Sequence, residues 1–163
     1  MMIIRKLLAN DATESFTCGQ VALDQYLRRY AWLNQRVDGA QTYVAVEGTV
    51  IAGYYSLCAG SVEWAGAPER VGKGLARRAI PVMLLARLAV RLEWQNRGIG
   101  QALLRDALLR TLQAADIAGI RAILVHAKDE AARRWYLRWD FEPSPTDPMH
   151  LLLLVKDARQ ALR

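Results

Sequence analysis

The chain has 163 residues, 53% of them hydrophobic, with a formal net charge of +6 and a sequence pI near 9.7. This length predicts one domain over residues 1–163 with a single buried core. Two widely spaced cysteines suggest neither a disulfide framework nor a metal site. With no signal-like start and no apolar run of about 20 residues, the sequence predicts a cytoplasmic protein that does not span a membrane.

The first half of the chain predicts strands around one helix. Residues 3–9 predict an opening strand, and apolar side chains at helical spacing over 21–36 predict a helix. The buried face of this helix is expected to hold Leu23, Tyr26, Leu27, Tyr30 and Leu33. Residues 42–46 and 50–57 predict a hairpin that turns at Gly48. A glycine-rich and basic stretch over 62–78 predicts a flexible excursion.

The second half alternates strands and helices. The nearly continuous apolar run over 82–92 predicts a central strand covered on both faces. A helix with a buried stripe follows, and that stripe consists of Ile99, Leu103, Ala107 and Leu108. The remaining predicted elements are a strand over 122–125, a helix over 130–138, a proline-marked loop over 143–148 and a strand over 151–155. This order predicts a three-layer α/β domain around one twisted sheet.

The loop Gln95-Asn96-Arg97-Gly98-Ile99-Gly100, between a predicted strand and a predicted helix, has the features of an anion site. Gly98 and Gly100 can adopt backbone conformations that a side chain disfavours and allow a ligand close to the main chain. The helix start offers free N–H groups and the positive end of its dipole, which favour a pyrophosphate. Arg97 adds a permanent positive charge.

The order of these motifs resembles the GCN5-related N-acetyltransferase (GNAT) family. A dinucleotide fingerprint would need a third glycine, but position 103 is leucine, and no Gly-Lys-Ser/Thr follows as in a P-loop. Gln-x-x-Gly-x-Gly after an apolar strand resembles the acyl-CoA loop of that family. The strand 121–126 and the segment 129–141 resemble its downstream strand and tyrosine-bearing helix, although Asp140 replaces the usual glycine.

The resemblance implies the GNAT fold, a mixed twisted central sheet with splayed parallel strands flanked by helices. It also implies acetyl-CoA as co-substrate, with the pantetheine arm lying between two strands and the pyrophosphate on the glycine loop. No metal is implied. The residues expected to bind the co-substrate are Leu88, Ala89, Val90, Gln95, Asn96, Arg97, Gly98, Ile99 and Gly100.

Tyr136 matches the tyrosine of the family's helix, which implies that it is the general acid at the CoA sulfur. A phenol with a pKa near 10 is a suitable proton donor to a thiolate. Aromatic residues in a cluster such as Trp135, Trp139 and Phe141 are more often core than catalytic. The upstream loop favours catalysis for Tyr136.

No general base is evident in the sequence. His126 ends a strand, His150 lies in a loop, and Glu47, Glu63 and Glu93 are more typical of solvated carboxylates. A lysine amine with a pKa near 10.4 needs help to lose its proton, whereas an α-amine near 7.7–8.0 is already partly neutral. The absence of a base motif weakly favours an α-amine acceptor.

A narrower resemblance covers nearly the whole chain. The segments 16–36, 40–46, 53–57, 80–90 and 143–151 resemble acetyltransferase toxins of bacterial type II toxin–antitoxin pairs. This resemblance implies acetylation of the α-amino group of aminoacyl-tRNA, which blocks translation. It also implies a ribbon-helix-helix antitoxin as partner and a homodimer.

Basic residues are candidates for tRNA contact, because arginines and lysines neutralise phosphates. The candidates are Arg28, Arg29, Lys73, Arg77 and Arg78. Arginines on a helix are often only a solvated face, so for Arg28 and Arg29 both interpretations stand equally. Arginines and tryptophans over 133–139 could stack on a nucleotide, but core packing is the stronger interpretation there.

Two other functions stand behind the toxin hypothesis. One is an acetyltransferase of a small amine, a peptide or a protein N-terminus, which would show no salt-dependent preference for charged tRNA. The other is a non-enzymatic CoA-binding or nucleic-acid-binding regulatory domain, which would not turn over acetyl-CoA.

Overall fold

The computed structural model describes residues 1–163, which form two compact units. Unit 1 comprises Met1–Cys58 and Ala86–Ala107, and unit 2 comprises Ala59–Leu85 and Leu108–Arg163. The single domain expected over the whole chain stays a prediction.

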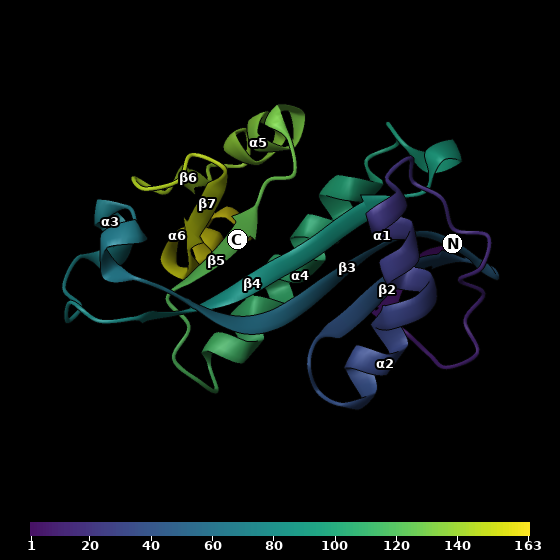
Figure 1. Ribbon diagram of the computed structural model, residues 1–163, viewed down its shortest axis with the longest axis horizontal. Coiled ribbons are helices and arrows are strands. Elements are labelled where there is room, and N and C mark those ends of the chain that lie inside the picture. Colours follow the sequence, from purple (N-terminus) through teal and green to yellow (C-terminus); the bar gives the residue numbers. More distant parts are fainter. The chain divides into compact units, whose positions relative to one another are not determined.

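The strands of unit 1 confirm the expected hairpin. Strand β1 (Met2–Lys6) pairs antiparallel with β2 (Gln41–Glu47), and β2 pairs antiparallel with β3 (Val50–Val62). Strands β2 and β3 are labelled in Figure 1. Gly48 turns the chain between β2 and β3 with a φ of 61°. Such a positive φ favours glycine, which explains the turn at this residue.

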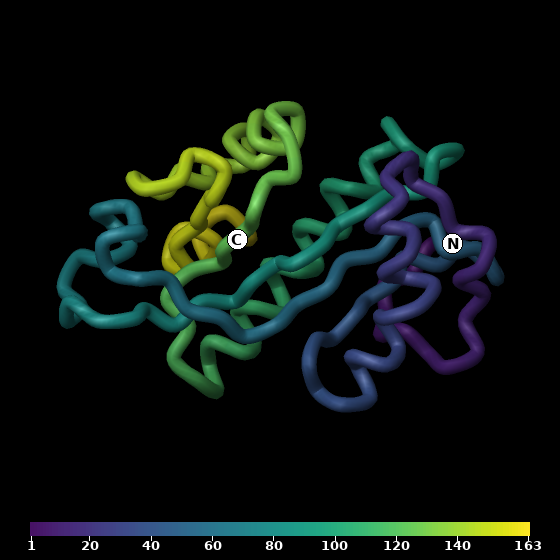
Figure 2. Tube along the Cα trace, in the orientation of Figure 1, coloured from purple at the N-terminus to yellow at the C-terminus, as the bar shows by residue number.

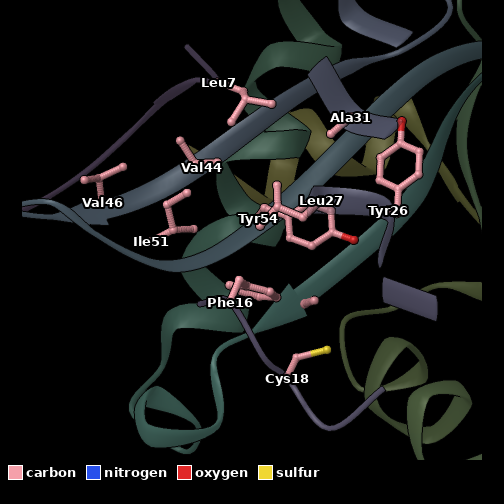
Figure 3. Packing of buried hydrophobic residues seen from close by; sticks show 11 residues of the cluster. Leu7, Phe16, Cys18, Tyr26, Leu27, Ala31, Val44, Val46, Ile51 and Tyr54 are labelled. Atoms are coloured by element: carbon pink, nitrogen blue, oxygen red, sulfur yellow. The ribbon is translucent and has the colours of Figure 1, made fainter. Parts of the chain in front are cut away.

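A helical segment covers the hairpin in unit 1. It consists of α1 (Val21–Gln25), a π-helical segment η1 (Tyr26–Tyr30) and α2 (Ala31–Arg36). Leu27 and Ala31 of this segment share a buried cluster with Val44 and Tyr54 of the strands, and Figure 3 shows these side chains close together. The helix predicted over 21–36 is therefore confirmed as one run with a π-helical centre.

The π-helical centre changes which residues are buried. Tyr30 and Leu33, predicted to face the core, are 52% and 55% exposed, whereas Ala31 is fully buried. A π-helix bonds each residue to the fifth along, so it shifts the buried stripe by one position from α-helical spacing. The prediction for Tyr30 and Leu33 was wrong for this reason.

The first turns of α4 (Ile99–Ala115) pack on Gly53 of β3 within unit 1. A Cβ atom at Gly53 would lie 2.8 Å from the carbonyl oxygen of Ala89 and 2.9 Å from Cδ1 of Leu103. Only a residue without a side chain allows this approach. Gly53 therefore sets the distance between β3, the end of β4 (Ile80–Val90) and the start of α4.

We expect Gly53→Ala to lower the free energy of unfolding by about 1–3 kcal/mol, because overpacking forces neighbouring backbone to move. Urea denaturation measures the change. Gly60→Ala is the matched control in the same strand, since its Cβ would lie 3.7 Å from its nearest neighbours, an ordinary contact. An equal loss in both variants would show that the strand, and not the close packing, is responsible.

Unit 2 holds the parallel part of the sheet. Strand β4 pairs parallel with β5 (Ala122–His126) from Val82↔Ala122 to Leu85↔Val125, and β4 then continues to Val90. Strand β7 (His150–Leu154) pairs antiparallel with β5 and with β6 (Glu142–Pro143). The path of this part of the chain can be followed in the tube of Figure 2.

The seven strands are hydrogen-bonded in the order β1-β2-β3-β4-β5-β7-β6. Unit 2 contains the helices α3 (Glu69–Gly72), α5 (Glu130–Leu137) and α6 (Val155–Ala161), and the part of α4 from Leu108 onward. This mixed sheet with flanking helices confirms the predicted α/β class. The end of the β4–β5 pairing before the end of β4 agrees with the splayed parallel strands that were expected. None of the helices is long and apolar enough to cross a membrane.

Candidate active site

The loop over residues 95–100 lies in unit 1 and has two left-handed residues. Asn96 has a φ of 63° and Gly98 a φ of 80°. A Cβ at Gly98 would meet nothing within 4 Å, so the loop is open to solvent on that side. Gly100, predicted to adopt a special conformation, has none, because it is the second residue of α4. Asn96 supplies the second left-handed position, which asparagine tolerates better than most residues.

The main-chain N–H groups of residues 96–101 donate to no acceptor within the protein. The first bond into the helix is from the Ala102 amide to the Gly98 carbonyl, at 3.1 Å. Amides at a helix start with no internal acceptor form a ready site for an anion. The residues present therefore fit the pyrophosphate that was expected at this loop, and that role stays a prediction.

Gln95 holds this loop in place. Its Nε2 atom donates to the carbonyl oxygens of Cys18 at 3.0 Å and Val90 at 2.9 Å. The side chain of Gln95 thus connects the end of β4 to the segment before α1. This contact indicates that Gln95, predicted to bind the co-substrate, orients the loop.

Arg91 is a second anchor, which the sequence analysis did not identify. The side chain is buried, and its Nε and Nη1 atoms donate to the carbonyl oxygens of Ile51 at 2.8 Å and Ser15 at 2.9 Å. Its guanidinium also lies 5.5 Å from the ring of Phe16. A buried arginine bonded to carbonyls fixes the chain just before the loop. The only sequence signal was an arginine directly after an apolar strand.

The three arginines of unit 1 that were predicted to bind the co-substrate or tRNA differ in the contacts that their side chains make within the protein. Arg97 is exposed and lies 5.1 Å over the ring of Trp94, at the loop. Arg28 is exposed, but its Nη2 atom donates to the carbonyl oxygen of Phe16. Arg29 is exposed and makes no ion pair or side-chain hydrogen bond. Of the two helix arginines, Arg29 is the one available to a ligand.

The end of β4 is less covered than predicted. Ala89 is buried, but Leu88 and Val90 are only half-buried, as are Leu84 and Ala86. The predicted central position of this strand is confirmed, because β4 is the fourth of seven strands. The predicted cover on both faces was wrong, because such cover would bury all of these side chains. The half-buried Leu88 and Val90 therefore lie in unit 1, shortly before the loop over residues 95–100.

Tyr136 lies in unit 2, on α5, and packs edge-to-face against Trp135 at 5.0 Å and Phe141 at 5.3 Å. It is only 8% exposed, and burial raises the pKa of its hydroxyl above the ordinary value. The hydroxyl makes no hydrogen bond, yet it is not among the fully buried atoms without a partner. The phenol therefore stays protonated at neutral pH and keeps access to an external acceptor.

Both ends of α5 are defined by acidic residues. The carboxylate of Asp129 accepts a hydrogen bond from the Ala132 amide at 2.8 Å, which caps the helix start. Asp140, after the helix, has a φ of 69°. Aspartate therefore adopts the left-handed conformation that the family's glycine would supply, and the turn that directs Phe141 back onto Tyr136 forms without glycine.

The two histidines of the chain stack on each other in unit 2. His126 of β5 and His150 of β7 have ring centroids 3.9 Å apart with an interplanar angle of 14°. Burial and the neighbouring His150 lower the pKa of His126, while Asp147 acts in the opposite direction. His150 also lies 3.3 Å from Asp147. His126 is therefore neutral at pH 7.

The lowered pKa of His126 predicts a loss of stability in mild acid. The unfolded chain, in which His126 returns to a pKa near 6.5, binds this proton more readily than the folded protein. The free energy of unfolding should therefore fall as the pH drops through about 6.5, and stop falling below the folded pKa. His126→Gln should flatten this slope in urea denaturation between about pH 8 and 5. Identical slopes in both proteins would contradict the prediction.

The basic candidates of the β3–β4 connection lie in unit 2. Lys73, Arg77 and Arg78 are exposed and form no ion pair. The guanidinium of Arg77 lies 4.7 Å over the ring of Trp64. The stretch predicted as a flexible excursion contains α3 and a 3-10 turn over Trp64–Gly66, so it is more ordered than expected.

Within unit 1 the structure brings together the residues from Leu88 to Val90, the loop over 95–100, and the segment with Arg28 and Arg29. Unit 2 carries Tyr136 and the cations Lys73, Arg77 and Arg78. No group of histidine, cysteine and acidic side chains is arranged to hold a metal ion. The free amides of unit 1 can bind an anion, and the hydroxyl of Tyr136 in unit 2 can donate a proton.

Comparison with known proteins gives consistent results. The profile of the acetyltransferase (GNAT) domain matches residues 38–143. A tRNA-acetylating toxin of Mycobacterium tuberculosis is 48% identical over 155 residues, which are 95% of this chain and 93% of that protein.

Two solved structures have the same fold. AtaT complexed with acetyl-methionyl-tRNAfMet is 25% identical, with a TM-score of 0.93 and coverage of 100% of both chains. A tyrosine-to-phenylalanine variant of AtaT bound to the C-terminus of the antitoxin AtaR and acetyl-CoA is 24% identical, with a TM-score of 0.84 over 98% of this chain and 97% of that one.

Proposed function

Because the chain belongs to the GCN5-related N-acetyltransferase family, we propose that it transfers the acetyl group of acetyl-CoA to the α-amino group of aminoacyl-tRNA and so blocks translation. One observation carries this proposal: the 48% identity to a tRNA-acetylating toxin over 95% of this chain. The anion site of the loop supports it, since its amides fit the pyrophosphate of CoA.

Bound acetyl-CoA supplies an activated thioester. The amides of residues 96–100, with Arg97, hold its pyrophosphate, and the end of β4 from Leu88 to Val90 orients the pantetheine arm. The neutral acceptor nitrogen bonds to the carbonyl carbon as the carbon–sulfur bond breaks. Tyr136 donates its phenolic proton to the departing sulfur, solvent takes the proton from the new amide nitrogen, and solvent then returns a proton to the phenolate.

The acceptor chemistry agrees with the side chains present. An α-amine with a pKa near 7.7–8.0 is partly neutral at physiological pH, so it needs no dedicated base. Exposed cations without ion pairs supply contacts for tRNA phosphates. These cations are Arg29 in unit 1 and Lys73, Arg77 and Arg78 in unit 2, with Arg28 as a second contact from the helix.

The proposal extends to location and assembly. The protein acts in the cytoplasm, where aminoacyl-tRNA is present. It forms a homodimer, with one N-acetyltransferase domain in each chain. Its inhibitor is an antitoxin with a ribbon-helix-helix DNA-binding region. The related AtaT toxin, bound to the C-terminus of its antitoxin, supports an antitoxin partner for this chain.

The test is acetylation of total bacterial tRNA by radiolabelled acetyl-CoA, with charged tRNA in one reaction and chemically deacylated tRNA in the other. Label in the charged pool alone is expected. Label in neither pool, together with acetylation of peptides or small amines, would identify a general acetyltransferase. No turnover of acetyl-CoA with any acceptor would leave a binding protein.

A further inference from the structure

Helix α5 and the two residues that follow it carry two arginines and two tryptophans at the surface of unit 2, of which only Trp135 is half-buried. Arg134, Trp135 and Arg138 are separated by helical spacing, and Trp139 follows at the end of the helix. A hollow of about 440 Å³ is lined by Ala131, Arg134, Trp135, Leu137 and Arg138. We call Arg134, Trp135, Arg138 and Trp139 the α5 face.

The charges of the α5 face are poorly neutralised. Arg133, which lies outside it, is used internally, because its Nε donates to the Pro148 carbonyl at 2.9 Å and its Nη1 lies 3.3 Å from Glu130. Arg134 has a side chain 67% exposed and lies 4.0 Å from the same glutamate. Arg138 has no ion pair. Two exposed guanidinium groups four residues apart, with at most one carboxylate near them, favour an anionic ligand.

The aromatic side chains of the α5 face are accessible. Trp139 is 36% exposed, and its ring lies 6.2 Å from that of half-buried Trp135 at an angle of 72°. Large aromatic rings beside cations at the surface are the composition of a stacking platform for unpaired bases. An acidic peptide would satisfy the arginines but would not use the ring faces.

We propose that the α5 face binds a single-stranded segment of RNA, with bases on the tryptophans and phosphates on Arg134 and Arg138. This inference rests on the proposed function in one respect, that the RNA is the unpaired acceptor end of aminoacyl-tRNA. A duplex hides the faces of its bases, so it fits this surface less well. The neighbouring residue in the helix is Tyr136, the proposed proton donor.

The arginines are tested by salt-dependent binding of a fluorescent single-stranded RNA to the full-length protein. In Arg134→Gln/Arg138→Gln the slope of log K against log salt should become shallower by about 1.4, about 0.7 for each charge removed. Arg105→Gln/Lys156→Gln is the matched control, since it removes two exposed helix cations elsewhere. An equal change in both double variants would overturn the proposal.

The tryptophans are tested separately. Trp139→Ala should weaken binding of the same RNA by about five- to hundredfold, whereas Trp139→Phe should retain most of it, because phenylalanine still stacks. Circular dichroism and thermal denaturation check that both variants fold. Equal loss in both variants would show a structural role and overturn stacking.

Competition completes the test. A blunt RNA duplex of equal phosphate number should compete less well than the single strand. Displacement by polyglutamate at lower concentration than by the single strand would instead identify an acidic protein segment as the ligand. If the wild type acetylates charged tRNA but binds no single-stranded RNA, this inference fails and the proposed function stands. If the wild type binds single-stranded RNA but acetylates no charged tRNA, the proposed function fails and RNA binding by the α5 face stands.

Discussion

Tyr136→Phe is expected to slow acetyl transfer to aminoacyl-tRNA by about 10²–10⁴-fold, the usual contribution of a positioned general acid. The substitution removes only the hydroxyl of Tyr136, which makes no hydrogen bond in the protein. Packing against Trp135 and Phe141 should therefore persist, with little change in melting temperature. Single-turnover rates with radiolabelled acetyl-CoA measure the effect.

Tyr30→Phe is the matched control, because this tyrosine is 52% exposed and has no proposed role. Full activity in both variants would exclude Tyr136 as the acid. The pH profile gives a second readout. Since burial raises the pKa of Tyr136, the phenol keeps its proton at least up to about pH 10, and the rate should not decline with rising pH below that value.

Gly98→Ala is expected to raise the dissociation constant for CoA by about tenfold or more, corresponding to about 1.4 kcal/mol. Gly98 has a φ of 80°, and alanine pays about 1–2 kcal/mol to adopt such a conformation. Relief of this strain rotates the amides that should bind the pyrophosphate. Calorimetric titration with CoA measures the change.

Gly48→Ala is the control for strain. Gly48 has a φ of 61°, and a Cβ at either glycine would meet nothing within 4 Å. Both variants should lose similar stability in urea denaturation, but only Gly98→Ala should weaken CoA binding. Unchanged CoA affinity in Gly98→Ala would remove the loop from the proposed binding site.

Periodicity and loop chemistry predicted most elements. The hairpin at Gly48, the stripe from Ile99 to Leu108 and the helix with Tyr136 all follow from local patterns, because local sterics and side-chain spacing decide them. The anion loop was predictable for the same reason, since its free amides depend on a strand, a glycine and a helix start. Helix α6 was missed because a strand-like apolar run leads into it directly.

The amino-acid order alone was thus enough to identify the family resemblance and most of the order of elements, and to propose a phosphate loop and Tyr136 as proton donor, because each is a short-range pattern. It could not show that η1 turns Tyr30 outward, that Arg91 anchors the loop from a buried position, or that Arg133 is used internally while Arg138 is free. These features depend on partners distant in sequence. Ser15, Ile51 and Pro148 provide carbonyl oxygens that only folding brings within hydrogen-bond distance.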